Sequence, residues 1–163
     1  MNNFFVSEMT LDDIPNLTAL FADLYDDLAD KGSPLRLNPR YLTDYLNLVS
    51  ESERTKIFCL FEDDVLCGFV CASIMPLNRK FRQSGNESYG FVSELYVSPE
   101  QRNRGYGLEL LREAEAFFAR MGIRCIELSV VAGNEGALKF YEQHGFKRDY
   151  YNLRKEVDPD DVW

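Results

Sequence analysis

The chain has 163 residues with 45% hydrophobic and 28% charged side chains, the composition of one soluble globular domain with a substantial core. Its net charge of −9 makes nucleic acid an unfavourable partner, because the phosphate backbone would be repelled. No apolar run is long enough to span a bilayer and the N-terminus lacks the basic-then-apolar order of a signal peptide, so we expect a cytoplasmic protein without a membrane partner.

The first half of the chain predicts a strand, two helices and a hairpin. Thr10 and Asp13 have the spacing of a capping box at the start of the first helix, and Lys31-Gly32 ends it. Gly68, inside the second hairpin strand, marks a bulge or a close packing contact. In chain order the elements are a strand at 3–6, a helix between Thr10 and Lys31, a helix at 39–50, and antiparallel strands at 56–61 and 65–75.

The second half predicts strands and helices in alternation. The polar segment 77–88 leads from the hairpin to the next strand, either as an ordinary hairpin loop or as a mobile lid. The elements are a strand at 91–97, a helix from Leu108 to Met121, a strand at 125–131, a helix at 137–144 with Asn134 as N-cap, strands at 146–147 and 150–157, and a frayed acidic tail at 158–163. This order predicts an α/β (α+β) fold: one domain over residues 1–163, with a mixed, mostly antiparallel sheet flanked by helices.

The cysteines give no metal-binding pattern. No two of them have the Cys-x-x-Cys spacing, and His144 is the only histidine. All four lie in apolar, strand-like runs, at Cys59, Cys67, Cys71 and Cys125. We therefore expect buried, reduced thiols and no bound metal.

The segment that follows the strand at 91–97 has the features of an anion site. Gly105 and Gly107 stand where the next helix begins, and Arg102 and Arg104 precede them. The first N–H groups of a helix lack partners within it, and the helix dipole favours negative charge there. Glycine also lets the backbone come close to a bulky oxyanion. The segment predicts a phosphate-bearing ligand, with an ordinary surface turn as the alternative.

Three motifs in the second half of the chain resemble the GCN5-related N-acetyltransferase (GNAT) family, whose acetyl-CoA signature is Q/R-x-x-G-x-G/A. They are Leu95-x-Val97-x-Pro99, Arg102-x-x-Gly105-x-Gly107 and Asn134-x-x-Ala137-x-x-Phe140-Tyr141-x-x-x-Gly145-Phe146. A dinucleotide fingerprint fits less well because Leu110 stands where its third glycine would be, and the chain has no Gly-Lys-Ser/Thr of a P-loop. The resemblance implies the GNAT fold and acetyl-CoA as acetyl donor, without a metal.

The resemblance also implies roles for the residues of the cofactor site. The N–H of Leu95 would face the acetyl oxygen, and the backbone of Val97 would pair with the pantetheine arm, which lies like an added strand between the fourth and fifth strands. Asn134 would reach the pantetheine arm and Phe140 would pack against it. The other cofactor-binding positions belong to the same strand and the glycine loop: Tyr96, Arg102, Asn103, Arg104, Gly105, Tyr106 and Gly107.

Two side chains are candidates for proton transfer. Tyr141 matches the family's tyrosine that protonates the departing thiolate, although the same residue fits a packed core position. Glu94 lies inside an apolar strand, where desolvation disfavours the charged carboxylate and makes it a better proton acceptor. It is either the base, acting through water, or a structural carboxylate. Ser93 or the acidic first helix could carry the water chain instead.

The acceptor is expected to be a cationic amine, with polyamines ahead of aminoglycosides or basic peptide termini. Residues 1–30 hold seven carboxylates and no Lys or Arg, and the resemblance places this segment beside the acceptor cleft. Asp23, Asp26 and Asp27 are the candidate binding residues, unless these acids merely keep the helix solvated. The alternative function is a non-catalytic CoA-binding domain that acts as a sensor or interaction module. Either function is compatible with a homodimer.

Overall fold

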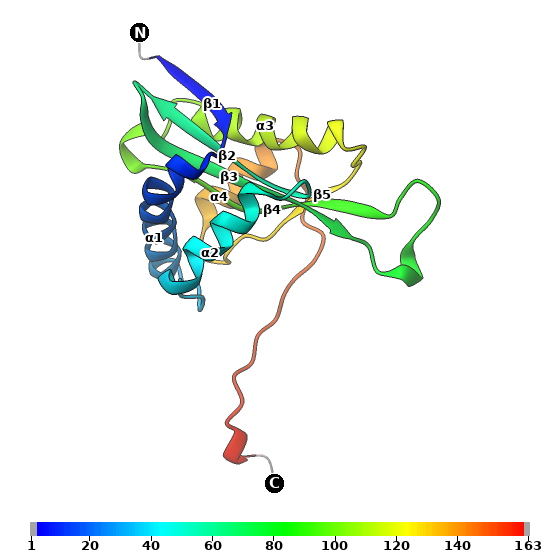
Figure 1. Cartoon of the computed structure of the whole chain (residues 1–163). Coiled ribbons are helices and arrows are strands. Elements are labelled where there is room, and N and C mark those ends of the chain that lie inside the picture. Colours follow the sequence, from blue (N-terminus) through cyan, green and yellow to red (C-terminus); the bar gives the residue numbers. More distant parts are fainter. Residues whose placement is uncertain (1–2, 162–163) are drawn as a thin grey trace. The chain divides into compact units, whose positions relative to one another are not determined.

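The computed structural model describes residues 3–161 and shows a five-stranded mixed sheet with strands in the order β1-β2-β3-β4-β5 (Figure 1). The first four strands pair antiparallel, and β4 and β5 pair parallel. The elements are β1 (Phe4–Glu8), α1 (Ile14–Asp30), α2 (Pro39–Ser50), β2 (Thr55–Glu62), β3 (Val65–Pro76), β4 (Ser88–Val97), α3 (Tyr106–Arg120), β5 (Ile126–Leu128) and α4 (Glu135–Gln143). The predicted fold class is confirmed.

The chain divides into two compact units, residues 1–133 and residues 134–163. The first contains the whole sheet with α1, α2 and α3, and the second contains α4 and the segment behind it. A unit as short as the second lies below the ~40 residues at which a chain can fold without disulfides or metals. We propose that both units belong to the one domain expected for residues 1–163.

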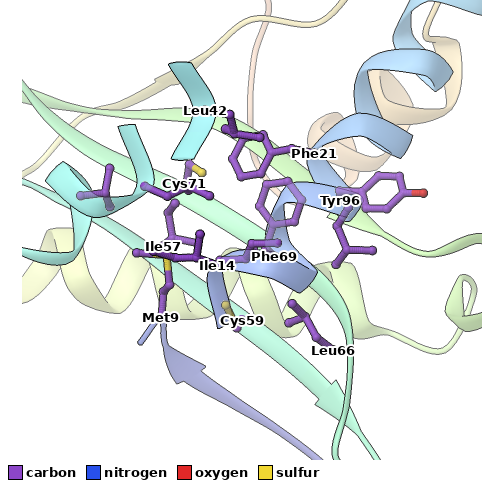
Figure 2. Close-up of a cluster of buried hydrophobic side chains, with 14 of the residues drawn as sticks. Met9, Ile14, Phe21, Leu42, Ile57, Cys59, Leu66, Phe69, Cys71 and Tyr96 are labelled. Atoms are coloured by element: carbon purple, nitrogen blue, oxygen red, sulfur yellow. The ribbon is translucent and has the colours of Figure 1, made fainter. Parts of the chain in front are cut away.

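Helices α1 and α2 cover one face of the sheet. Their buried side chains pack against strand residues of that face in a single core, shown in Figure 2. Phe21 of α1 stacks on Phe69 of β3 with 4.4 Å between the ring centroids, and Phe69 in turn contacts Tyr96 of β4. Neighbouring strand residues point to opposite faces, so Ile57 and Cys59 belong to this core while Phe58 and Leu60 do not.

Helix α3 covers the other face. Leu110, Ala114 and Phe118 of α3 are fully buried against β2, β3 and β4. The absence of a side chain at Gly90 lets α3 approach β4 closely, because a Cβ there would lie 2.8 Å from the Phe118 ring. The sheet is therefore covered on both faces, as the burial of its central strands requires.

Gly68 has both roles that the sequence left open. The pairing of β2 with β3 shifts between Leu60 and Phe61, which leaves Cys67 as the extra residue of a bulge beside Gly68. A Cβ on Gly68 would also lie 2.8 Å from the carbonyl oxygen of Tyr96. Glycine is thus required here by close packing of two strands.

The segment predicted as a loop at 77–88 closes the hairpin of β3 and β4, and only its last residue, Ser88, belongs to a strand (Figure 1). It contains a 3-10 turn at Arg79–Phe81 and a bridge between Gln83 and Asn86. Cys125, expected to be buried, is exposed, whereas Cys59, Cys67 and Cys71 are buried as expected.

The sequence was wrong about the end of the sheet. Within residues 3–161, neither 146–147 nor 150–157 forms a strand, and β5 is limited to Ile126–Leu128. An alternating pattern becomes a strand only where another strand pairs with its N–H and C=O groups. Of the predicted tail, Pro159–Asp161 form a 3-10 turn and residues 162–163 lie outside the described part. None of the described helices has the length and apolar content needed to cross a membrane.

Candidate active site

A bulge in β4 sets the direction of Glu94. Val92 pairs with Ala72 and Glu94 pairs with Cys71, so Ser93 is an extra residue on β4. Val92 and Ala72 pack in the core under α3, whereas Cys71 packs in the core under α1 and α2. Without the bulge, Glu94 would point to the same face as Val92. The extra residue turns it toward α1 and α2, as bulges often do beside functional sites.

Two hydroxyl groups hold the Glu94 carboxylate. Tyr25 of α1 donates to its Oε1 at 2.8 Å, and Ser93 donates to its Oε2. Burial and then the Glu94 carboxylate raise the pKa of Tyr25 above its ordinary value. Burial, together with the nearby Glu94 carboxylate, raises the pKa of Tyr45. Both phenols therefore keep their protons at neutral pH, and each remains a hydrogen-bond donor.

A surface pocket of about 260 Å³ opens beside Glu94. Its walls come from α1, the segment before α2, α2 itself and β4: Phe21, Tyr25, Leu37, Asn38, Tyr41, Leu42, Tyr45 and Glu94. The lining is mostly aromatic and apolar, with the Asn38 amide and the Glu94 carboxylate as its polar side chains apart from the tyrosine hydroxyls. Aromatic faces and a carboxylate both attract an ammonium group, so the pocket suits a cationic amine.

The three acids proposed for the acceptor do not line this pocket. Asp27 accepts from Arg102 Nη2 at 3.0 Å and from Lys31 Nζ at 3.4 Å. Partial burial acts to raise the pKa of Asp27. The hydrogen bond from Arg102 and the positive charges of Lys31 and Arg102 together outweigh burial and lower this pKa. Asp26 is exposed, and Asp23 is exposed near Tyr96, whose pKa rises through burial and then the Asp23 charge. The charge that faces the pocket is that of Glu94, which the sequence had assigned to proton transfer alone.

Strands β4 and β5 pair over only three residues each, from Gly90 to Val92 and from Ile126 to Leu128. Beyond the bulge, no described strand pairs with this edge of β4. The chain after β5 instead runs toward the end of α1, since a Cβ on Gly133 would lie 2.2 Å from the carbonyl oxygen of Lys31. The two strands therefore separate after the bulge, as the resemblance implied.

The backbone of Leu95 faces the edge where the strands separate. Ser98 donates to the carbonyl of its partner Cys67 in β3 at 2.8 Å. Antiparallel partners alternate between hydrogen-bonded and non-bonded pairs, so the N–H and C=O of Leu95 and Val97 point away from β3. The Val97 carbonyl accepts from Arg102 Nε at 2.8 Å. The Leu95 amide is thus oriented for a ligand lying along this edge.

The glycine loop has the backbone geometry that the sequence predicted. Gly105 has φ 84° and Asn103 has φ 62°, both in the left-handed region that favours glycine or asparagine. Leu108 and Glu109 both donate to the Gly105 carbonyl, so the α3 amides that precede them lie in the unpaired first turn. A Cβ on Gly105 would meet no protein atom within 4 Å. The loop therefore offers helix N-terminal amides to an anion, with open space beside them.

Two loop side chains bind the protein itself. Glu62, at the end of β2 and 8% exposed, accepts from Arg104 Nη1 at 2.8 Å and from the Tyr106 hydroxyl at 2.6 Å. Arg104 Nη2 also donates to the carbonyl of Glu100 at 3.1 Å. These contacts fix the loop to the hairpin, so Tyr106 can serve a ligand only through its backbone. No local sequence pattern marks Glu62 as a partner of this loop, because it stands beside the two turn aspartates Asp63 and Asp64.

The candidate residues of α4 form a small aromatic cluster. Tyr141, 9% exposed, makes edge contacts with the rings of Phe140 and Phe146 at centroid distances of 5.2 and 5.5 Å. Burial raises the pKa of Tyr141 to about 12, so the phenol keeps its proton at neutral pH. Asn134 caps α4 by accepting from the amide of Ala137. Asn134, Phe140 and Tyr141 belong to the second unit, and the structure brings them together with one another only.

Among the described residues, no three His, Cys, Asp or Glu side chains form a group that could hold a metal ion.

Comparison with known proteins identifies the family. The sequence model of the acetyltransferase (GNAT) family matches residues 21–146. The chain belongs to the GNAT family. The match includes Glu94, the glycine loop and α4, so the family resemblance predicted from three motifs is confirmed.

Individual GNAT proteins resemble the chain over shorter stretches in sequence than in structure. An uncharacterized N-acetyltransferase of Methanocaldococcus jannaschii is 38% identical over 56 residues, which are 34% of this chain and 25% of that protein. One from Bacillus subtilis is 33% identical over 58 residues, 36% of this chain and 39% of that protein. The chain thus spans a quarter to about two-fifths of these curated relatives. A solved aminoglycoside N-acetyltransferase in complex with CoA superposes with a TM-score of 0.78 over 96% of both chains at 17% identity, which shows the shared fold.

Proposed function

We propose that the protein is an acetyl-CoA-dependent N-acetyltransferase whose acceptor is a small cationic primary amine. The observation that carries the proposal is the position of Glu94 in the tyrosine-lined pocket, one residue before Leu95 on β4. The bulge sends the Glu94 side chain to the pocket, while the Leu95 amide faces the edge beside β5. Acceptor and acetyl donor would therefore meet at adjacent residues of one strand.

The cofactor-binding residues present fit acetyl-CoA. The pyrophosphate would lie at residues 102–107, where helix N-terminal amides and the open side of Gly105 can receive an anion. The pantetheine arm would follow the free edge of β4 past Val97 toward Leu95. Arg102 would then release or share the Val97 carbonyl that it now occupies. When bound, acetyl-CoA supplies the thioester whose acetyl group is transferred.

The residues of the chain divide the proton transfers between them. Glu94 would accept the ammonium proton, directly or through one water, so that the amine nitrogen can attack. The Leu95 N–H would donate to the acetyl oxygen as negative charge develops on it. Tyr141, which retains its proton, would donate it to the departing thiolate. Two observations support Tyr141 as the proton donor: its place in the family motif and the protonated state of its hydroxyl.

A multiply charged amine fits the pocket better than an uncharged one. The ammonium group that is to be acetylated would face the carboxylate of Glu94, and a second ammonium group would lie against the faces of Tyr41 and Tyr45. Polyamines remain the first expectation. Aminoglycosides are also multiply charged amines, and one solved structural neighbour is an aminoglycoside N-acetyltransferase. Asp27 is left out of the acceptor site because Arg102 and Lys31 already neutralise it.

Release of free thiol from acetyl-CoA tests this function. Spermidine is expected to react with a higher kcat/KM than an uncharged amine of similar size at low salt, and the difference should shrink at high salt because ions screen the carboxylate. Equal values for both amines at low salt would contradict the cationic acceptor. Binding of CoA by calorimetry without thiol release for any amine would instead indicate the non-catalytic CoA-binding domain.

Gly105→Val is expected to weaken acetyl-CoA binding by about tenfold or more, ~1.4 kcal/mol or above. A β-branched side chain is strained at φ 84° and would fill the space beside the amides. Calorimetry on the folded variant measures the change.

Gly85→Val is the matched control for this change. Gly85 has φ 78° and likewise has no protein atom within 4 Å of an added Cβ, but it lies in the β3–β4 hairpin. The Gly85→Val variant carries a similar backbone strain at a site away from the glycine loop, so it should bind acetyl-CoA with wild-type affinity. If Gly105→Val also binds with wild-type affinity, the pyrophosphate does not lie at this loop.

A further inference from the structure

A carboxylate occupies a core position at the end of β2. Neighbouring residues of a strand point to opposite faces, so Phe58, Leu60 and Glu62 share the face that α3 covers. Phe58 and Leu60 are buried in the apolar layer under α3, and Glu62, 8% exposed, continues this row. Burying a charge costs free energy, and a buried ion pair can often be replaced by apolar residues without loss of stability. Stability alone therefore does not explain a carboxylate at this position.

Two partners of Glu62 flank the turn that leads into α3. Arg104 and Tyr106 stand directly before and after Gly105, whose φ of 84° turns the chain into the helix. The ring of Tyr106 is also fixed, because it packs against Phe4 of β1 with 5.0 Å between the centroids. One carboxylate thus restrains both residues next to the left-handed glycine. Displacement of either residue would move the first amides of α3.

We propose that Glu62 is a positioning residue for the cofactor, which holds the glycine loop (residues 102–107) so that the first amides of α3 face the pyrophosphate of acetyl-CoA. The inference rests on the proposed function, since it needs the pyrophosphate at this loop. Donors that are fixed in advance need no reordering when the ligand binds, so a restraint on the loop increases affinity. Glu62 acts through Arg104 and Tyr106 and does not contact the ligand itself.

The same contacts give Arg104 a different role from the one that the sequence predicted. Its Nη1 donates to Glu62 at 2.8 Å and its Nη2 donates to the carbonyl of Glu100 at 3.1 Å, so both terminal nitrogens are directed to the protein. The positive charge of Arg104 offsets that of the Glu62 carboxylate, which would otherwise repel an anion at the loop. Arg104 therefore supports the site through Glu62 and does not bind a phosphate.

Glu62→Ala is expected to raise the Kd of acetyl-CoA by about tenfold or more, because Arg104 and Tyr106 lose their common acceptor. Glu62→Gln should raise it less, since its amide oxygen can still accept a hydrogen bond. In both variants kcat at saturating acetyl-CoA should stay unchanged, because the loop holds the pyrophosphate and not the reacting thioester. Calorimetry measures the Kd, and steady-state rates separate KM from kcat. A fall in kcat at unchanged Kd would overturn the inference.

Glu8→Ala is the matched control. Glu8 lies at the opposite end of β1 from the residue that pairs with Glu62, and it forms an ion pair with Lys56. This variant also removes a carboxylate and its cation contact from the sheet, but it should bind acetyl-CoA with wild-type affinity. Wild-type affinity in folded Glu62→Ala would overturn the inference and leave the proposed function intact. A wild-type protein that does not bind CoA would overturn both.

A double variant distinguishes positioning from direct contact. Arg104→Met is expected to raise the Kd of acetyl-CoA severalfold in the wild-type protein and clearly less in Glu62→Gln, because Arg104 acts through the Glu62 charge. Tyr106→Phe keeps the ring on Phe4 and removes only the hydroxyl, so it should also raise the Kd. Glu62→Gln and Tyr106→Phe preserve side-chain size, so they test the inference even if Glu62→Ala does not fold. Equal increases from Arg104→Met in both backgrounds would overturn it, since Arg104 would then contact the ligand itself.

Discussion

Glu94→Gln is expected to lower kcat by about 10²- to 10⁴-fold, the usual contribution of a general base. Glutamine has nearly the same shape, and its carbonyl can still accept from the Tyr25 hydroxyl, so the pocket should keep its form. It cannot accept the proton of an ammonium group. Steady-state rates measure the loss.

Two variants distinguish the base from a general effect of charge or shape. Asp23→Asn removes a charge from the exposed side of α1 and should leave kcat unchanged. Tyr25→Phe removes the hydrogen bond to Glu94 but keeps the ring, so a smaller loss than that of Glu94→Gln is expected. An unaltered kcat in Glu94→Gln would make Glu94 a structural or binding carboxylate. The proton would then pass through Ser93 and water.

The elements with complete local signals were predicted from the sequence. Helix α2 spans Pro39–Ser50 as expected, because Asn38 caps it and Pro39 occupies its first turn. The β2–β3 hairpin is also as expected, with Asp63 and Asp64 in the left-handed conformation of its turn. These signals act over a few residues, and the rest of the fold did not change their outcome.

The orientation of Glu94 could not be predicted, because it depends on pairing between distant residues. The bulge at Ser93 exists only in the register of β4 against β3, and no sequence pattern marks it. Likewise, Asp27 looked like an acceptor ligand because its partner Arg102 is distant in sequence. The backbone geometry of the glycine loop was predictable, since its glycines act on their own backbone. The pocket beside Glu94 is assembled from α1, the segment before α2, α2 and β4, so it could be found only from the fold.

The missing last strands have a different cause. The alternation in 150–157 is real, and it predicts a strand in any context that supplies a neighbour. The single described chain supplies none. A local pattern therefore indicates the capacity to form a strand, while the partner decides whether one forms.

Tyr141→Phe is expected to lower kcat by about 10²- to 10⁴-fold while leaving acetyl-CoA affinity nearly unchanged. Phenylalanine keeps the ring that packs against Phe140 and Phe146, so the variant removes only the hydroxyl proton. Because the pKa of Tyr141 is raised to about 12, the hydroxyl is protonated at every pH below that value. The loss should therefore be constant from about pH 6 to 9.

Tyr150→Phe is the control for Tyr141→Phe. Tyr150 is an exposed tyrosine of the same unit, and loss of its hydroxyl should leave kcat unchanged. Calorimetry with CoA separates catalysis from binding, since a proton donor to the thiolate contributes only as the thioester breaks. If Tyr141→Phe turns over at the wild-type rate, Tyr141 serves packing alone. The thiolate would then leave without a protein acid, taking its proton from water.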